Sequence, residues 1–167
     1  AALMLTFLLR NWRQAAELII LAPTIEVASN SFLPCRDMVK NDDELSDLIQ
    51  IQDHTRTLTH RTTGATLKVI AAESNTAAGK KAGFVLIDEA WLFGKQVNAM
   101  NMLTEATGGL ASRPEGCVIL LSTQSDSPPA GVFKTKLDYA RDVRDGKIID
   151  SKFLPIIFEM PKSMLDN

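Results

Sequence analysis

The longest uninterrupted apolar runs of the chain have the length of buried strands. Residues 17–24, 84–90 and 116–125 read as strands covered on both faces, as in a parallel sheet. A fourth run, 153–160, predicts a last strand, and Pro155 within it favours an edge position because proline donates no ladder hydrogen bond.

Between these runs, apolar residues recur at helical spacing and predict amphipathic helices. The expected helices cover residues 1–12, 24–40, 42–50, 96–110 and 130–146. The first is apolar almost all round, which predicts burial on several sides. Pro34 bends or ends the second, and Gly146 closes the last.

Residues 54–72 alternate threonine with other residues on both sides of "TTGA", which predicts a β-hairpin with Gly64 in its turn. The small and polar residues 73–83 then predict a loop. Helices alternating with buried strands in this order predict an α/β fold, with a parallel sheet between layers of helices.

Composition narrows the class of protein. The 167 residues suit one domain, and a net charge of −2 gives no broad basic field for nucleic acid, although a local patch is still compatible with it. Cys35 and Cys117 form no CxxC pair, and His54 and His60 lack ligand spacing, so neither a disulfide nor a zinc site is predicted. We read the cysteines as buried thiols. The apolar N-terminal run lacks the basic region of a signal peptide and is too short to span a membrane.

Polar residues follow three of the predicted strands at the point where each strand ends. They are Thr24, Asp88, Glu89, Ser122, Thr123 and Gln124. Ligands of open parallel sheets bind beyond the carboxyl ends of the strands, so these side chains are expected to converge on one ligand. A nucleotide site needs such an arrangement.

The residue types indicate distinct roles. Asp88 would hold Mg²⁺ through a water, and Glu89 would orient and deprotonate an attacking water. Ser122 and Thr123 would hydrogen-bond the γ-phosphate or its water. Each motif has a simpler alternative: a solvated acid or helix cap after a strand, and a cap or turn formed by Ser122 or Ser125. The two motifs together, in this order, favour the nucleotide site.

The chain contains no G-x-x-x-x-G-K-[ST] phosphate loop. The nearest stretch, "NTAAGKKAG" around Gly79 and Lys80, lacks the first glycine and the Ser/Thr, and a strand follows it where a helix is needed. The first helix has no starting Met and no N-cap residue, so we expect a phosphate loop immediately upstream of Ala1 in a longer protein.

Four stretches resemble the N-terminal ATPase domain of the large terminase subunit of tailed bacteriophages: "AALMLTFLL", "ELIILAPTIEVA", "TLKVIAAESNTAAGKKAGFVLIDEAW" and "GCVILLSTQSDSP". The resemblance implies a three-layer, RecA-like (ASCE P-loop NTPase) domain that uses ATP and Mg²⁺ to drive double-stranded DNA into a procapsid. It also implies a portal protein and a small terminase subunit as partners, a ring of copies on the portal, no membrane, and the host bacterial cytoplasm.

The same resemblance implies the metal role for Asp88, the catalytic base for Glu89 and the coupling role for Ser122 and Thr123. Relatives carry a trans-acting basic residue in the loop before this motif; here Lys80 or Lys81 would substitute weakly, and solvated loop charges are the simpler reading.

The ATPase domain is expected to cover 1–160, truncated at its N-terminus, with 161–167 beginning a linker to a nuclease domain outside the chain. The fragment alone is expected to hydrolyse ATP poorly or not at all. Two alternatives stay open. "DEAW" and "LST" also suit a superfamily-two helicase, and a non-enzymatic α/β interaction module would need no site.

Overall fold

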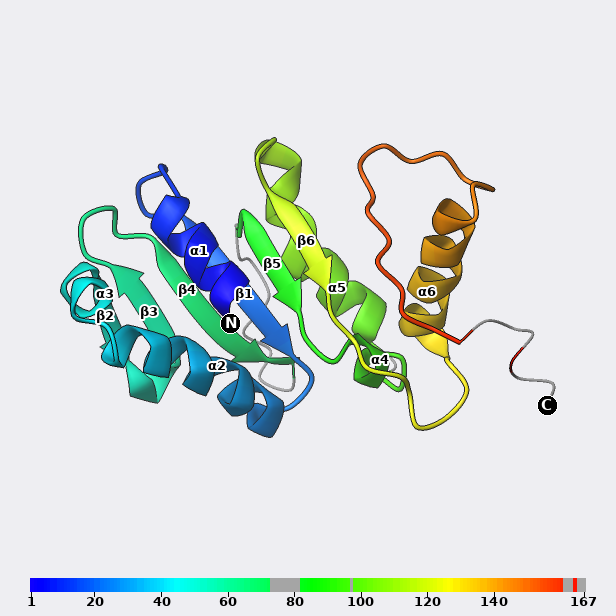
Figure 1. Cartoon of the computed structure of the whole chain (residues 1–167), viewed down its shortest axis with the longest axis horizontal. Coiled ribbons are helices and arrows are strands. Elements are labelled where there is room, and N and C mark those ends of the chain that lie inside the picture. The colour runs from blue at the N-terminus through cyan, green and yellow to red at the C-terminus, as the bar shows by residue number, and fades with distance from the viewer. Residues whose placement is uncertain (73–81, 97, 161–163, 165–167) are drawn as a thin grey trace.

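The computed structural model describes residues 1–72, 82–96, 98–160 and 164. Strands of these residues form one sheet in the order β2-β3-β4-β1-β5-β6 (Figure 1). Strands β4, β1, β5 and β6 are parallel, and β2 and β3 extend the sheet antiparallel to β4. Their bounds are β1 Glu17–Ala22, β2 Ile49–Gln52, β3 Thr57–His60, β4 Thr66–Ala71, β5 Phe84–Ile87 and β6 Cys117–Leu120.

Helices cover both faces of the sheet and make three layers (Figure 1). One face carries α1 (Ala2–Arg10), α2 (Ile25–Lys40) and α3 (Asp43–Leu48); the other carries α4 (Ala90–Phe93), α5 (Ala99–Thr107) and the start of α6 (Gly131–Arg144). Short 3₁₀ turns η1 (Asp53–Thr55) and η3 (Gly108–Ser112) follow β2 and α5. The predicted α/β sandwich is confirmed. Among the described residues, no helix is both long enough and apolar enough to cross a bilayer.

Strand β1 lies at the centre of the sheet, and this position explains its unbroken apolar run. Leu18 and Ile20 face the cluster beneath α1 and α2, while Ile19 and Leu21 face the cluster beneath α4 and α5. All four are at most 2% exposed, because successive strand side chains point to opposite faces and both faces are covered.

Helix α1 packs on the sheet with one face only, which differs from the expected burial on several sides. Met4, Leu5 and Leu8 are buried, whereas Leu3 is 48% exposed. In α2 the threonine before the helix is its N-cap: the Thr24 hydroxyl accepts a hydrogen bond from the Val27 backbone N–H at 3.3 Å. The helix continues through its internal proline to Lys40.

The predicted hairpin forms between β3 and β4, and Gly64 in its turn has a φ of +66°, which glycine adopts without strain. Strand β2, which pairs with β3, was not predicted because "IQIQ" is short and continues directly from α3. The cysteines are free; Cys35 is buried as expected, but Cys117 is only half-buried.

The predicted last strand at 153–160 is wrong. The segment is irregular and runs back along α6 (Figure 1). Side chains hold it there: the Tyr139 hydroxyl donates to Asp150 at 2.7 Å, and the Arg141 guanidinium binds Glu159 at 2.6 Å. Its backbone joins no sheet of the described residues, and a strand requires such pairing. The predicted linker, 161–167, lies outside the described residues except for Met164.

Candidate active site

The polar residues that follow β5 and β6 are brought to one edge of the sheet by the backbone. β5 lies between β1 and β6, with Ile87 opposite Leu21 on one side. Beyond the end of β5, the Asp88 N–H donates to the Leu21 carbonyl and the Ala90 N–H to the Leu121 carbonyl, each at 2.9 Å. The ends of three parallel strands are therefore locked in register at their carboxyl edge, where sheets of this kind bind ligands.

The Asp88 carboxylate is oriented by two donors. Its Oδ2 accepts a hydrogen bond from the Ser31 hydroxyl of α2 at 2.6 Å, and its Oδ1 accepts one from the Glu89 backbone N–H at 3.1 Å. Sequence reasoning missed Ser31. The available signal was position: Ser31 lies seven residues after the Thr24 cap, two turns further along the same face of a helix that starts at the carboxyl end of β1.

Glu89 has hydrogen-bond partners different from those of Asp88. Its backbone is left-handed, with φ +48° and ψ +52°, a conformation that costs a non-glycine residue about 1–2 kcal/mol. Its Oε2 accepts hydrogen bonds from the Trp91 indole N–H at 2.8 Å and from the Thr123 hydroxyl at 3.0 Å. Its Oε1 accepts none from the residues that the structure describes. The two carboxylates thus have separate partners, and among the described residues no donor contacts Glu89 Oε1.

Ser122 makes local contacts of the kind that the simpler alternative predicts. Its hydroxyl oxygen accepts from the Trp91 backbone N–H at 3.1 Å, at the start of α4, and its hydroxyl donates to the Thr123 carbonyl at 2.8 Å. Ser125 donates to the Ser127 carbonyl in the following turn. Thr123 is the residue of this group that contacts the acidic pair directly.

The candidate basic residue Lys80, with its neighbour Lys81, lies outside the described residues. Lys95, just after α4, was not predicted; it binds Asp126 with N–O distances of 2.8 and 2.9 Å. The hydrogen bond from Lys95, and then that from Ser127, lowers the pKa of Asp126 below its ordinary value.

The donor set fits Mg²⁺ better than a metal that needs a protein cage. No group of three or more His, Cys, Asp or Glu side chains gathers within the described ranges. Mg²⁺ is commonly held by one or two carboxylates together with waters and substrate phosphates. Asp88, half-buried at the strand edge, provides one such carboxylate.

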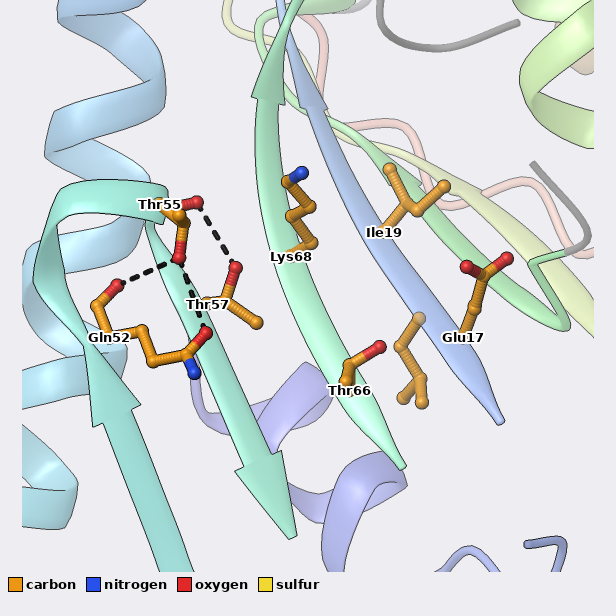
Figure 2. Close-up of a pocket in the computed structure, with 8 residues that line it drawn as sticks. Glu17, Ile19, Gln52, Thr55, Thr57, Thr66 and Lys68 are labelled. Atoms are coloured by element: carbon orange, nitrogen blue, oxygen red, sulfur yellow. Dashed lines mark hydrogen bonds between the residues drawn. The ribbon is translucent and has the colours of Figure 1, made fainter. Parts of the chain in front are cut away.

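Two surface hollows lie elsewhere. The larger, of about 210 Å³, is lined by polar residues of the sheet face that include Glu17, Thr57, Thr66 and Lys68 (Figure 2). Glu17 and Thr66 are the first residues of β1 and β4, so this hollow lies toward the opposite end of the strands from Asp88. The smaller, of about 160 Å³, is lined by residues of α1, the segment after it and β5, together with Glu115 before β6. Neither is lined by the acidic pair or by the hydroxyls after β6, and the candidate site is identified by the convergent strand ends instead.

No family model matches the chain, and no curated protein matches it in sequence. Solved structures do match. The HK97 bacteriophage large terminase aligns with 96% of the chain at a TM-score of 0.77 and 19% identity. The chain has the fold of a large terminase ATPase domain.

Two further terminases show the same fold. The large terminase ATPase domain of Thermus phage P74-26 covers 89% of the chain (TM-score 0.56, 15% identity, 76% of that domain matched). The large terminase of another thermophilic bacteriophage covers 85% (TM-score 0.59, 13% identity, 34% of that protein matched). The chain spans about a third of the HK97 terminase, 32% of its length. The predicted RecA-like terminase fold is confirmed.

Proposed function

We propose that this chain is the ATPase domain of a phage large terminase subunit, which uses ATP hydrolysis to move double-stranded DNA into a procapsid. The observation that carries the proposal is the meeting of Asp88, Glu89 and Thr123 at the carboxyl edge of a terminase-like sheet. Strand ends, acidic pair and hydroxyl all belong to one connected hydrogen-bond network.

Asp88 is the proposed metal partner. Bound Mg²⁺ would neutralise charge on the β- and γ-phosphates during their separation. Ser31 and the Glu89 N–H hold the Asp88 carboxylate in one orientation, which reduces the conformational freedom it would lose on binding.

Glu89 is the proposed general base. With Oε2 occupied by two donors, Oε1 is the oxygen left to accept a proton from water. The water oxygen attacks the γ-phosphorus, the bond from that phosphorus to the β–γ bridging oxygen breaks, and ADP and phosphate form. Thr123 joins the base to the loop after β6, which supports the coupling role for that loop; Ser122 acts in the same role by supporting the start of α4.

The wider assembly is part of the proposal. Double-stranded DNA, a portal protein and a small terminase subunit are the proposed partners of a ring of copies in the host cytoplasm, with DNA cut by a nuclease domain outside these residues. Lys80 is proposed as a point charge toward the phosphates of a neighbouring copy.

The test uses the full-length protein and two DNA assays. A packaging motor hydrolyses Mg-ATP and displaces a third strand from a triplex without separating the duplex. Strand separation of the duplex would favour the helicase alternative. A folded protein that neither binds nor hydrolyses ATP would leave an interaction module.

A further inference from the structure

Trp91 contacts both halves of the proposed site. Its indole N–H donates to Glu89 Oε2 at 2.8 Å, while its backbone N–H donates to the Ser122 hydroxyl at 3.1 Å. The sequence offered no reason to select it, because an aromatic residue after an acidic pair usually packs in a core. Here the polar edge of the ring is used, and the donor serves a carboxylate.

The face of the same ring carries a cation. Lys95 Nζ lies 4.7 Å from the centre of the Trp91 ring, within the range of a cation–π contact. Lys95 also binds Asp126 in the loop after β6. The loop is therefore attached to α4 at two points: Ser122 and Thr123 contact Trp91 and Glu89 at its start, and Asp126 holds Lys95 three residues later.

The end of the helix that carries Trp91 packs closely against the start of α6. A Cβ on Gly94, at the end of α4, would lie 2.5 Å from the Ala130 carbonyl oxygen, and one on Gly131 would lie 2.6 Å from the Gly94 carbonyl oxygen. The end of α4 and the start of α6 thus touch through two glycines, which fixes the helix that presents the indole.

We propose that Trp91 is a positioning residue for Glu89: it holds Oε2 so that Oε1 faces the attacking water, and it transmits movement of the 122–126 loop to the base. A glutamate side chain has three rotatable torsions and samples several rotamers when free, whereas the Trp91 side chain has two and its ring already contacts Lys95. The inference rests on the proposed ATPase function, and it concerns the regulation of that same site.

The contact itself can be tested without any activity. The chain has two tryptophans, so an amide correlation spectrum shows two indole N–H peaks, and Trp12→Phe assigns them. We expect the Trp91 peak to lie downfield and to move upfield in Glu89→Gln, because the charge on the acceptor is lost. Asp126→Asn should also move it, whereas Asp138→Asn, which breaks the exposed Lys134–Asp138 pair on α6, should not. A Trp91 peak whose chemical shift is unchanged in both Glu89→Gln and Asp126→Asn overturns the proposal.

The functional arm uses the full-length protein. Trp91→Phe keeps an aromatic ring but removes the N–H donor, so kcat for ATP should fall about tenfold to a hundredfold, as expected for a misplaced catalytic group, with KM nearly unchanged. Trp12→Phe, at an exposed site 71% accessible, is the matched control and should keep wild-type kcat.

The outcomes separate the two ideas. Wild-type kcat in Trp91→Phe, in a protein that hydrolyses ATP, overturns the positioning role and leaves the ATPase intact. A wild-type protein without hydrolysis overturns the proposed function and, with it, the positioning role of Trp91. If Trp91→Phe fails to fold, the indole N–H peak decides instead: a Trp91 peak that does not move in Glu89→Gln overturns the contact on which the positioning role depends.

Discussion

Replacing Ser31 by alanine tests whether α2 orients the Asp88 carboxylate. The Ser31 hydroxyl has one proton and two acceptors in reach, Asp88 Oδ2 at 2.6 Å and the Val27 carbonyl at 2.9 Å. The charged and closer acceptor should take the proton. Ser29 on the same helix is the matched control, because among the described residues its hydroxyl donates to the Ile25 carbonyl, also at 2.9 Å, and to no carboxylate.

The expected loss of stability in Ser31→Ala follows from two contributions, the lost hydrogen bond and the changed helix propensity. A hydrogen bond to a charged group contributes about 1.5–3 kcal/mol to stability, and the lower part of that range applies because Asp88 is half-exposed and water replaces part of the bond. Alanine is the better helix former by about 0.5 kcal/mol. Ser31→Ala should therefore destabilise the domain by about 1–1.5 kcal/mol, while Ser29→Ala should leave stability unchanged or raise it by up to about 0.5 kcal/mol.

Urea unfolding of both variants measures the difference, and a cycle with Asp88→Asn isolates the pairwise part. We expect the effect of Ser31→Ala to shrink by about 1 kcal/mol when Asp88 is already asparagine. Unfolding free energies of such variants can be compared to within about 0.5 kcal/mol. If those of the two serine variants differ by less than this, Ser31 does not orient Asp88, and that part of the site is misread.

Three further changes test the packing and charges around the site. Gly94→Ala should destabilise by about 1–3 kcal/mol in urea unfolding, because its Cβ would meet the Ala130 carbonyl and force the contact between α4 and α6 apart; wild-type stability would contradict that close approach. Leu8→Ala should cost about 2–5 kcal/mol by the same assay, since Leu8 is fully buried between α1 and the sheet, and a loss below about 1 kcal/mol would argue against that packing. The hydrogen bond from Arg13 lowers the pKa of Glu115 below its ordinary 4.5, so the pair stabilises the fold above pH 4.5 and loses this as pH falls through the lowered pKa. The stability difference between wild type and Glu115→Gln should thus narrow below pH 4.5. A difference that widens there would contradict the stabilising role of the ionised Glu115 carboxylate.

β1 and β5 were predictable because they lie inside the sheet beneath covering helices; β6 forms an edge of the sheet and its residues are only half-buried, so its expected burial on both faces was wrong. β1, β5 and β6 appear in the sequence as continuous apolar runs, and their polar ends were expected at one edge from the sequence alone. The run at 153–160 shows the limit of this reasoning. Its composition suits a strand as well as β6 does, but ladder pairing depends on a neighbouring backbone, which a local pattern does not contain.

The chemistry of the site was predictable in part. Asp88, Glu89 and Thr123 were selected by their positions after strands, and the structure links them through hydrogen bonds. Ser31 and Trp91 were not selected, because each reaches the site from another element, by a helix face in one case and by a left-handed turn at Glu89 in the other. Such contacts follow from tertiary packing, which spacing along the chain does not encode.

Glu89→Gln in the full-length protein is the most direct test of the ATPase site, with Glu105→Gln on the exposed surface of α5 as its control. Steady-state Mg-ATP hydrolysis and nucleotide affinity are measured for both variants and the wild type. We expect Glu89→Gln to lower kcat by about a hundredfold or more with affinity retained, while Glu105→Gln hydrolyses ATP at the wild-type rate. Undiminished turnover in Glu89→Gln would contradict the assignment of the base and, with it, the mechanism built on this edge of the sheet.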